Sequence, residues 1–512
     1  MFHHVRLGID LGTTRTVVAA ADDGRYPLAS FEIDGAFRDW IPGVAAEVDG
    51  SLFFGWDAVA RAGDATAVVR SIKRAVSLVA PDDPIEALAS KPSAISLLSG
   101  FAAHVTDAIR ERSSLELGSD RIEATIAVPA NATSRQRWST MEAFRRAGVD
   151  VLGVLNEPTA AGIEFAHRHL GPVGKRSPKR YVVVYDLGGG TFDSSAISLA
   201  ERRFELIATE GLSRLGGDDF DETILELALE RAGVDRKTLG SATRARLLDQ
   251  ARLAKEAMAP KTRNVLVDLS AALVDREPVV LDAASVLAAC EPLVERTMEL
   301  LERLMLRLPS YGIDPDNARE LGAVYVVGGA AAFVGVARAL RAKHGRKVQL
   351  AAQPHAATAV GLAIAGDERA GVYVSEAVTR HFGVWREALA GRVKSFDPIF
   401  GKDARAEGGD LVVQRRYRPR HTVGHLRFLE CSSLDEHGGP AGDLLPWREI
   451  LFPYDPALAD HDDLGRAISD APSLRDQVIE ETYRYERSGA IEVRIENVTR
   501  GYARTYELGR LA

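Results

Sequence analysis

The stretch YVVVYDLGGGTFDSSAIS, residues 181–198, decides the fold. It begins with β-branched and aromatic residues, which are typical of a buried strand. Asp186 stands where this strand ends, and Gly188–Gly190 follow as a tight turn before a second strand. Consecutive glycines permit positive φ and a close backbone approach, so their N–H groups can point at one anionic ligand. Thr191 and Asp193 add a hydroxyl and a second carboxylate at the rim of the turn.

The same pattern occurs near the N-terminus. Residues 5–19 read VRLGIDLGTTRTVVA, which again predicts a strand, a glycine turn and a strand. Asp10 corresponds to Asp186, at an offset of 186 − 10 = 176 residues. This repeat predicts two similar lobes, each with a phosphate-binding turn and an aspartate; two unrelated hairpins are the less favoured alternative. Two carboxylates facing each other across a cleft suit Mg²⁺, which takes few protein ligands when a nucleotide supplies the rest.

Four motifs resemble those of the heat-shock protein 70 family, within the actin and sugar-kinase ATPase superfamily. They are IDLGTT at 9–14, NEPTAAGIEF at 156–165, DLGGGTFD at 186–193 and VVGGAAAF at 326–333. In that family the first and third bind phosphate, the second connects the lobes and the fourth binds adenosine. The resemblance implies an α/β fold with a two-lobed, actin-like ATPase domain built from duplicated ribonuclease-H-like halves. An all-β, sandwich-like domain is expected to follow it.

The resemblance also implies the domain boundaries. The nucleotide-binding ATPase domain is expected at 1–366, an interdomain linker at 367–378 and a β-sandwich substrate-binding domain at 379–512. In the family this linker is acidic and leucine-rich. Here Asp367 and Glu368 supply acid, but valine and tyrosine at 372–374 replace the leucines. Coupling between the domains therefore depends on a divergent linker.

Composition narrows the class of protein. The 512 residues are 46% hydrophobic and 27% charged, which is ordinary for a globular chain of two or more domains. A net charge of −8 disfavours a protein that coats nucleic acid. Cys290 and Cys431 are the only cysteines, so no disulfide framework is expected. Apolar runs such as Val151–Leu155 are too short to cross a bilayer, and no signal core follows the N-terminus, where His3 and His4 are expected to fray. We therefore expect a cytoplasmic protein without a membrane or nucleic-acid partner.

The resemblance assigns five catalytic residues. Lys73, in the segment SIKRAVSLV at 71–79, corresponds to a lysine near the γ-phosphate, and a solvated surface lysine is the alternative. An ammonium there can neutralise charge on the transferred phosphoryl group and align the attacking water. Glu157 corresponds to a residue that orients metal-bound water. The catalytic set is Lys73, Asp10, Asp186, Thr191 and Glu157, of which Asp10 and Asp186 hold Mg²⁺ largely through water.

The resemblance further implies contacts with ATP or ADP from both glycine turns, from LGGDDFD at 215–221, from the helix predicted at 242–258 and from the adenosine motif. The implied residues are Gly12, Thr13, Thr14, Arg15, Gly188, Gly189, Gly190, Gly216, Gly217, Lys255, Gly328, Gly329 and Ala330. Helix capping is the alternative for Gly216 and Gly217. Pro129 and Arg137 correspond to the family's interdomain switch, and a simple strand end is the alternative for Pro129.

The base side of the expected nucleotide site departs from the family pattern. Ala330 replaces a usual serine, and Ala332 replaces the arginine that stacks on adenine. Arg252 stands in place of a ribose-bonding glutamate, His355 in place of an aspartate and Arg15 in place of a small polar residue. A lost stacking cation costs about 0.5–2 kcal/mol, and a lost hydrogen bond costs a similar amount. We expect hydrolysis to be retained, with nucleotide affinity roughly one to three orders of magnitude below the family norm.

The C-terminal part has the pattern of strands. Segments at 381–385, 411–418 and 425–432 alternate, and 490–508 predicts a final hairpin. No counterpart of the family's helical lid follows Leu508, so fast peptide exchange is expected. Phe382, Val384 and Trp385 are candidates for the peptide groove. Residues 460–485 are expected to form an insertion in the sandwich, with one or two helices as the alternative. The arginines at 415, 416, 418 and 420 suit either a solvated hairpin, which we favour, or acidic partners.

The function implied is that of an ATP-dependent molecular chaperone in protein folding and the stress response. It would hydrolyse ATP to ADP and phosphate to control the binding of unfolded or extended polypeptide. A J-domain co-chaperone and a nucleotide exchange factor are the further partners implied. The altered base side favours one alternative, a nucleotide-gated, non-enzymatic client-binding protein with weak or no ATPase activity. A small-molecule kinase on the same fold is disfavoured, because the connecting motif is of the chaperone type.

Overall fold

The chain divides into two compact units. The computed structural model describes residues 5–117, 121–170, 179–199, 203–212, 214–317, 319–375, 378, 380–388, 393–402, 404, 410–461, 463–486 and 491–508. Unit 1 comprises Met1–Asn131 and Ser139–Val374, and unit 2 comprises Ala132–Trp138 and Ser375–Ala512. None of the helices within the described ranges is long and apolar enough to span a membrane.

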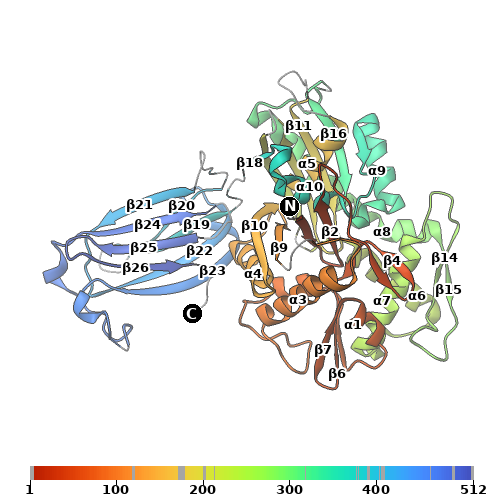
Figure 1. Ribbon diagram of the computed structural model, residues 1–512, viewed down its shortest axis with the longest axis horizontal. Coiled ribbons are helices and arrows are strands. Elements are labelled where there is room, and N and C mark those ends of the chain that lie inside the picture. Colours follow the sequence, from red (N-terminus) through yellow and green to blue (C-terminus); the bar gives the residue numbers. More distant parts are fainter. Residues whose placement is uncertain are drawn as a thin grey trace. The chain divides into compact units, whose positions relative to one another are not determined.

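Unit 1 contains two large sheets of the same design (Figure 1). The first has the order β10-β9-β1-β2-β5 and the second the order β17-β16-β11-β12-β13-β18. The strands of the first sheet are β1 (Arg6–Leu11), β2 (Arg15–Ala21), β5 (Ile41–Pro42), β9 (Ile122–Val128) and β10 (Val149–Asn156). The strands of the second are β11 (Tyr181–Leu187), β12 (Phe192–Ser198), β13 (Arg203–Leu212), β16 (Leu321–Val327), β17 (Val348–Leu350) and β18 (Tyr373–Ser375).

The two sheets repeat one topology. In each, an antiparallel hairpin, β1–β2 or β11–β12, is extended by two strands that run parallel to its first strand. Asp10 and Asp186 hold the same place, near the end of the first hairpin strand, opposite Val17 and Asp193 respectively. The repeat seen in the sequence is therefore a structural duplication, and the predicted α/β, two-lobed, actin-like fold is confirmed. We call the first sheet with residues 5–128 lobe 1 and the second sheet with residues 179–350 lobe 2.

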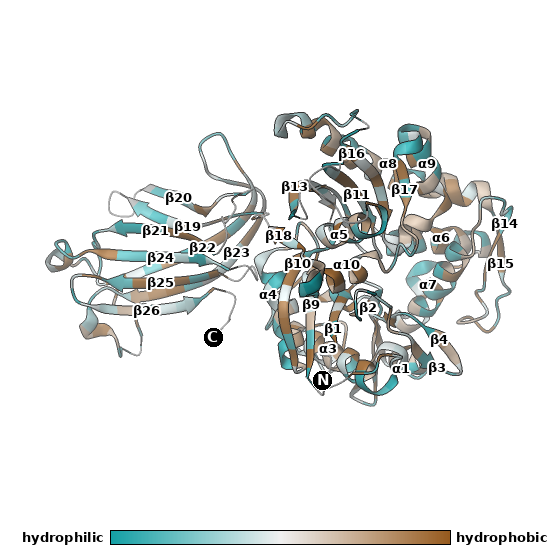
Figure 2. Cartoon of the chain, turned by 45° about the horizontal axis from the view of Figure 1, so that its top comes forward, coloured by the Kyte–Doolittle hydropathy of each residue, from teal (hydrophilic) through white to brown (hydrophobic). Residues whose placement is uncertain are grey.

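Two buried helices pack against the sheets. α10 (Ala357–Gly366) packs on β1, β2 and β9, whereas α5 (Glu157–His169) packs on β11, β12 and β13, and the two helices pack on each other. The residues of α10 are apolar on all sides, so the helix is buried on all sides, and it is largely brown in Figure 2. Apolar residues from both sheets and both helices form one core cluster, which includes Val17, Ile163, Val184 and Leu362.

The remaining elements of unit 1 carry the outer parts of the lobes. The helices are α1 (Gly55–Arg61), α2 (Ile72–Ser77), α3 (Ala94–Arg112), α4 (Ser134–Arg146, which begins in unit 2), α6 (Gly217–Ala232), α7 (Ser241–Glu256), α8 (Ala283–Arg307) and α9 (Val334–His344). The short strands are β3 (Phe31–Ile33), β4 (Ala36–Arg38), β6 (Ala45–Val48), β7 (Ser51–Phe54), β8 (Ala67–Val69), β14 (Asn264–Val267) and β15 (Val279–Asp282). A side-chain cap stabilises the start of α4, because the Gln136 backbone N–H donates to Thr133 Oγ1 at 3.1 Å.

Unit 2 is the predicted all-β sandwich. One sheet has the order β20-β19-β22-β23 and the other the order β21-β24-β25-β26. Their strands are β19 (His381–Ala388), β20 (Val393–Phe400), β21 (Leu411–Tyr417), β22 (Val423–Leu434), β23 (Pro440–Pro453), β24 (Ile479–Tyr485), β25 (Ile491–Asn497) and β26 (Tyr502–Glu507). Alternate residues of β25 are buried, as its period of two predicts.

Two expectations for the C-terminal part are corrected. Phe382 and Val384 lie in the core of the sandwich, at most 1% exposed, so they are not available to a peptide groove. Their positions on β19 face the other sheet, and a local pattern does not show which face of a strand that is. Trp385 is only half-buried. The end of the segment expected to be an insertion, or alternatively helical, is the strand β24, which is central in its sheet.

Candidate functional site

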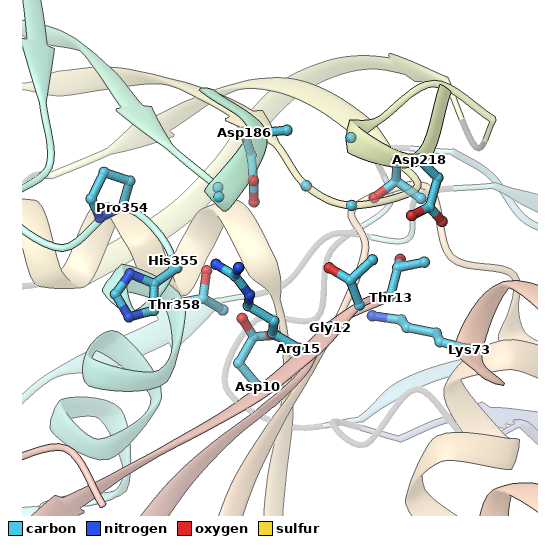
Figure 3. Close-up of a pocket in the computed structure, with 18 of the residues that line it drawn as sticks. Asp10, Gly12, Thr13, Arg15, Lys73, Asp186, Asp218, Pro354, His355 and Thr358 are labelled. Atoms are coloured by element: carbon cyan, nitrogen blue, oxygen red, sulfur yellow. The ribbon is translucent and has the colours of Figure 1, made fainter. Parts of the chain in front are cut away.

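The two glycine turns line one cavity of unit 1. Its volume is about 90 Å³, and Figure 3 shows side chains from both lobes around it. The lining residues are Asp10, Gly12, Thr13, Thr14, Arg15, Lys73, Glu157, Asp186, Gly188, Gly189, Thr191, Gly217, Asp218, Asp221, Arg252, Lys255, Glu256, Gly328, Gly329, Ala330, Pro354, His355 and Thr358. Most of the residues predicted from the sequence to bind nucleotide therefore meet at one place.

The turns of the two lobes are in direct contact. A Cβ atom added to Gly189 would lie 2.5 Å from Thr14 Oγ1 and 2.6 Å from Thr14 Cγ2, so only glycine permits this approach. One residue along, the position of Gly190 is equally close to the side chain of Thr13. Each turn follows the first strand of its hairpin. Together the two turns bring backbone N–H groups and threonine hydroxyls to the walls of one cavity.

The backbone conformation at position 328 also requires glycine. Gly328 has φ of 87°, in the region that favours glycine, and a Cβ there would lie 2.3 Å from the carbonyl oxygen of Leu187 and 2.6 Å from Asp186 Oδ1. The adenosine motif therefore turns directly over the end of β11. This places Gly329 and Ala330 on the wall of the cavity.

We call the part of the cavity that the two glycine turns line, where phosphate is predicted to bind, the phosphate end. Carboxylates and one lysine gather there. Lys73, from α2, donates to Glu157 Oε1 at 2.7 Å, and both side chains are largely buried. Asp10 and Asp186 line the same space from the two hairpins. Asp193 lies behind them, only 4% exposed, where Asn131 Nδ2 donates to its Oδ1 at 3.0 Å. One ammonium thus faces several carboxylates in a buried place.

The crowding of negative charge shifts the pKa values. Burial and the charge of Glu157 raise the pKa of Asp10 to about 7, although Lys73 opposes the shift. The same two causes raise the pKa of Asp186 and of Asp193 well above the ordinary value. Burial alone would lower the pKa of Lys73, but the charges of Glu157 and Asp10 outweigh it and raise that pKa. The site therefore favours the arrival of further positive charge.

This donor set fits Mg²⁺ bound largely through water and phosphate. Hard oxygen donors that repel one another are the groups that a divalent cation neutralises. Among the residues that the structure describes, no three His, Cys, Asp or Glu side chains are arranged to hold a metal ion by themselves. Asp10 and Asp186 offer two carboxylates on opposite walls, which matches a cation that takes its other ligands from elsewhere.

A buried ion pair holds Lys255, one of the residues predicted to contact the nucleotide. Lys255 Nζ lies 2.6 Å from Asp221 Oδ1 and donates to the carbonyl oxygen of Gly217 at 2.9 Å. Asp221 is 1% exposed, so its charge is balanced by Lys255 rather than by solvent. The pair fixes the end of α7 against the start of α6.

We call the part of the site beside residues 329–333, where the base is predicted to lie, the base end, and its lining is chemically different. A second cavity of about 200 Å³ adjoins the first and is lined by Arg15, Lys255, Glu256, Met258, Gly329, Ala330, Ala332, Phe333, Pro354 and His355. Its walls are apolar at Met258, Phe333 and the alanines. Arg252, expected in place of a ribose-bonding glutamate, is paired with Asp249 at 3.1 Å.

Some predicted residues lie outside the lining. Gly190 and Gly216 are packed against the turns without lining the cavity, since a Cβ on Gly216 would lie 2.5 Å from the Gly190 nitrogen. Pro129 follows the end of β9, and Arg137 lies in α4, 4% exposed. The switch role of these two residues stays a prediction.

Sequence reasoning did not assign five lining residues, which are Asp218, Asp221, Glu256, Pro354 and Thr358. The acidic motif LGGDDFD carried a signal for the first two, because buried carboxylates next to a glycine pair are costly unless they serve a cation. Glu256 directly follows Lys255, but the helical pattern alone does not show that its side chain reaches the cavity.

Comparisons with known proteins agree with this geometry. The family model described as Hsp70 protein matches residues 97–380. A protein named Chaperone protein HscA homolog, from Burkholderia multivorans (strain ATCC 17616 / 249), is 33% identical over 389 residues, which are 72% of this chain and 59% of that protein. Proteins of the same name from Burkholderia pseudomallei (strain 668) and Burkholderia mallei (strain SAVP1) are 33% identical over 390 residues, with the same shares. The chain thus spans about 59% of the length of these relatives.

Proposed function

The chain belongs to the Hsp70 family, and from this premise we propose that it is an ATP-dependent chaperone. Unit 1 binds ATP or ADP with Mg²⁺ and hydrolyses ATP to ADP and phosphate. Unit 2 binds unfolded or extended polypeptide, and the state of the nucleotide controls that binding. A J-domain co-chaperone and a nucleotide exchange factor are the partners that this function requires.

One observation carries the proposal. The glycine turns of two duplicated lobes are packed against each other at Gly189 and Thr14, with Lys73 and the carboxylates of both lobes lining the same cavity. Backbone N–H groups on two walls suit a chain of phosphates, which carries negative charge along its whole length. The same wall continues into an apolar cavity of suitable chemistry for a base.

Different residues of this chain have different roles in phosphoryl transfer to water. Thr13, Thr14 and Thr191 donate hydroxyls to phosphate oxygens, together with the N–H groups of the two turns. Lys73 neutralises charge that builds on the transferred group and aligns the attacking water. Glu157 holds the Lys73 ammonium in place through the 2.7 Å hydrogen bond.

The carboxylates complete the site. Asp10 and Asp186 would hold Mg²⁺ through its water ligands, and Glu157 would orient one of those waters. When bound, the cation supplies positive charge to the β- and γ-phosphate oxygens. Lys255, fixed by Asp221, offers its ammonium to the ribose.

Features of unit 2 support polypeptide binding. Its two sheets end in the edge strands β20, β23, β21 and β26, whose outer N–H and C=O groups are of the kind that pair with an extended chain. Trp385, half-buried and in edge-to-face contact with Phe396 at 5.7 Å, is the aromatic candidate that remains for a peptide contact. We propose that Pro129 and Arg137 relay the nucleotide state to this unit.

Single-turnover hydrolysis tests the proposal. With protein in excess over ATP and with Mg²⁺ present, Lys73→Ala is expected to slow phosphate release about 100- to 1,000-fold, because one preorganised cation is lost. Lys91→Ala is the matched control, since Lys91 forms an exposed pair with Glu86 away from the cavity. In parallel, ATP is expected to accelerate release of a labelled unfolded peptide from the wild type and not from Asp10→Asn.

The outcomes separate the candidate functions. Equal hydrolysis rates for the wild type and Lys73→Ala would contradict the site, and equal peptide release with and without ATP would contradict the coupling. A wild type that binds ATP without releasing phosphate would instead favour the nucleotide-gated, non-enzymatic protein. The cavity at the base end, where Ala332 replaces the arginine of the family pattern, is the observation that keeps this alternative open.

A further inference from the structure

Arg15 occupies the boundary between the phosphate end and the base end of the site. It is the first residue of β2, directly after the turn at residues 12–14, and it lines both the 90 Å³ and the 200 Å³ cavities. Figure 3 shows its side chain extending into the cavity beside His355. A nucleotide with its phosphates on the turns and its base in the second cavity has to lie against this side chain.

The Arg15 side chain crosses from lobe 1 to lobe 2. Its Nη2 donates to Glu256 Oε1 at 2.6 Å and to Oε2 at 2.8 Å. Glu256 is the last residue of α7, a helix of lobe 2 that packs on α6 and β14. Arg15 is 24% exposed and Glu256 is 42% exposed, so the pair lies at the mouth of the site rather than inside it.

Aromatic packing holds the guanidinium in this place. Its carbon lies 4.6 Å from the ring centroid of Trp40, within the range of a cation–π contact. Trp40 in turn packs on Trp56, with ring centroids 4.5 Å apart. Next to Trp40, Asp39 pairs with His355 Nε2 at 2.9 Å. Because the indole of Trp40 already holds one face of the guanidinium, Arg15 loses less conformational freedom when it pairs with Glu256 than an unsupported arginine would.

We propose that the Arg15–Glu256 bridge, supported by Trp40, holds the two lobes together at the base end of the nucleotide and slows the nucleotide's release. Glu256 and Trp40 are positioning residues that act through Arg15. The inference rests on the proposed nucleotide binding of unit 1. It gives a role to one departure from the family pattern, the arginine that follows the first glycine turn.

The expected effect is moderate. A partly exposed ion pair and a cation–π contact each change a rate by about two- to fivefold. Removing the ion pair alone is therefore expected to speed release about two- to fivefold. Because the charges are partly exposed, added salt weakens the bridge and is expected to speed release from the wild type more than from a variant that lacks the pair.

Release of a fluorescent N-methylanthraniloyl-ADP, chased with excess unlabelled ADP in a stopped-flow instrument, tests the bridge. Glu256→Gln is expected to release this probe about two- to fivefold faster than the wild type and to show the weaker salt dependence. Trp40→Leu is expected to act in the same direction with a smaller effect. Glu226→Gln is the matched control, because it removes an exposed glutamate–arginine pair, with Arg236, that lies within lobe 2.

The results distinguish the proposed bridge from the proposed nucleotide binding on which it rests. Faster release for Glu256→Gln and Trp40→Leu, with an unchanged control, supports the bridge. If the wild type binds the probe but both variants release it at the wild-type rate and salt dependence, the bridge is wrong and the proposed function stands. If the wild type does not bind the probe at all, the bridge and the proposed function are both wrong. Circular dichroism of each variant shows whether it is folded.

Discussion

The phosphate end and the base end of the site are built in different ways. At the phosphate end two glycine turns meet, and the Thr14 side chain lies so close to Gly189 that a Cβ atom has no room. At the base end the walls are side chains from separate elements, such as Arg15 from β2, Glu256 from α7 and Ala332 after β16. The first end therefore tolerates little change at its glycines, whereas the second can be rebuilt by exchanging side chains.

The electrostatics of the two ends differ as well. The phosphate end concentrates carboxylates around one lysine, and their pKa values rise because burial and mutual repulsion disfavour ionisation. At the base end Arg15 forms an ion pair with Glu256, and His355 is hydrogen-bonded to Asp39. The carboxylates of the phosphate end thus favour an incoming cation, whereas the charge of Arg15 at the base end is already balanced by Glu256.

The largest effect is expected at the phosphate end, in the ligand-free protein. The pKa of Asp10 is raised from 3.8 to about 7, so its folded form binds a proton more tightly than its unfolded form. Stability present below about pH 4 is therefore lost as the pH rises to about 7, by up to about 4 kcal/mol at about 1.36 kcal/mol for each pH unit. At pH 8, without Mg²⁺ or nucleotide, Asp10→Asn should be more stable than the wild type by up to this amount.

Urea unfolding of the wild type and Asp10→Asn at pH 5 and pH 8 measures this difference. The gain should shrink toward pH 5, and Asp64→Asn, at an exposed position, controls for the general loss of a negative charge. A gain of the same size at both pH values would mean that burial and neighbouring charges do not raise the pKa of Asp10.

A smaller effect is expected from the contact between the turns. Gly189→Ala puts a methyl group where Thr14 already lies within 2.6 Å, so the turns have to separate. Overpacking of this kind costs about 1–3 kcal/mol, which corresponds to a loss of about five- to 150-fold in ATP affinity. Isothermal titration with ATP and Mg²⁺ measures it. Gly63→Ala is the control, because no heavy atom lies within 4 Å of the added methyl; equal affinities for the two variants would refute the tight contact.

The smallest effect is expected at the base end. Ala332 is exposed and lines the second cavity, so Ala332→Arg can return a stacking cation without a steric clash. A cation–π contact of about 0.5–2 kcal/mol should tighten ATP binding by roughly two- to 30-fold. Ala342→Arg, on the exposed face of α9, adds the same charge elsewhere and should leave affinity unchanged. Equal titrations for both variants would show that the base does not lie against residue 332.

Local sequence determined the strands, the turns and their repetition. The strand, glycine turn and strand predicted over residues 181–198 are β11, Gly188–Gly190 and β12, and the hairpin predicted at 490–508 is β25 and β26. These features follow from side-chain alternation and from the conformational freedom of glycine, which act within a few residues of the chain. For the same reason the phosphate-end residues were predictable as a set, since most of them belong to the turns themselves.

Tertiary structure alone decided which side chains meet. Glu256 reaches Arg15 across 241 positions of the chain, and nothing in the helical pattern of α7 indicates a partner on another lobe. Likewise the strand pattern of β19 shows that Phe382 and Val384 share one face of the strand, but only the packing of the second sheet makes that face the core. A local pattern fixes the direction of a side chain relative to its own element, whereas the surface opposite it is set by the packing of the whole unit.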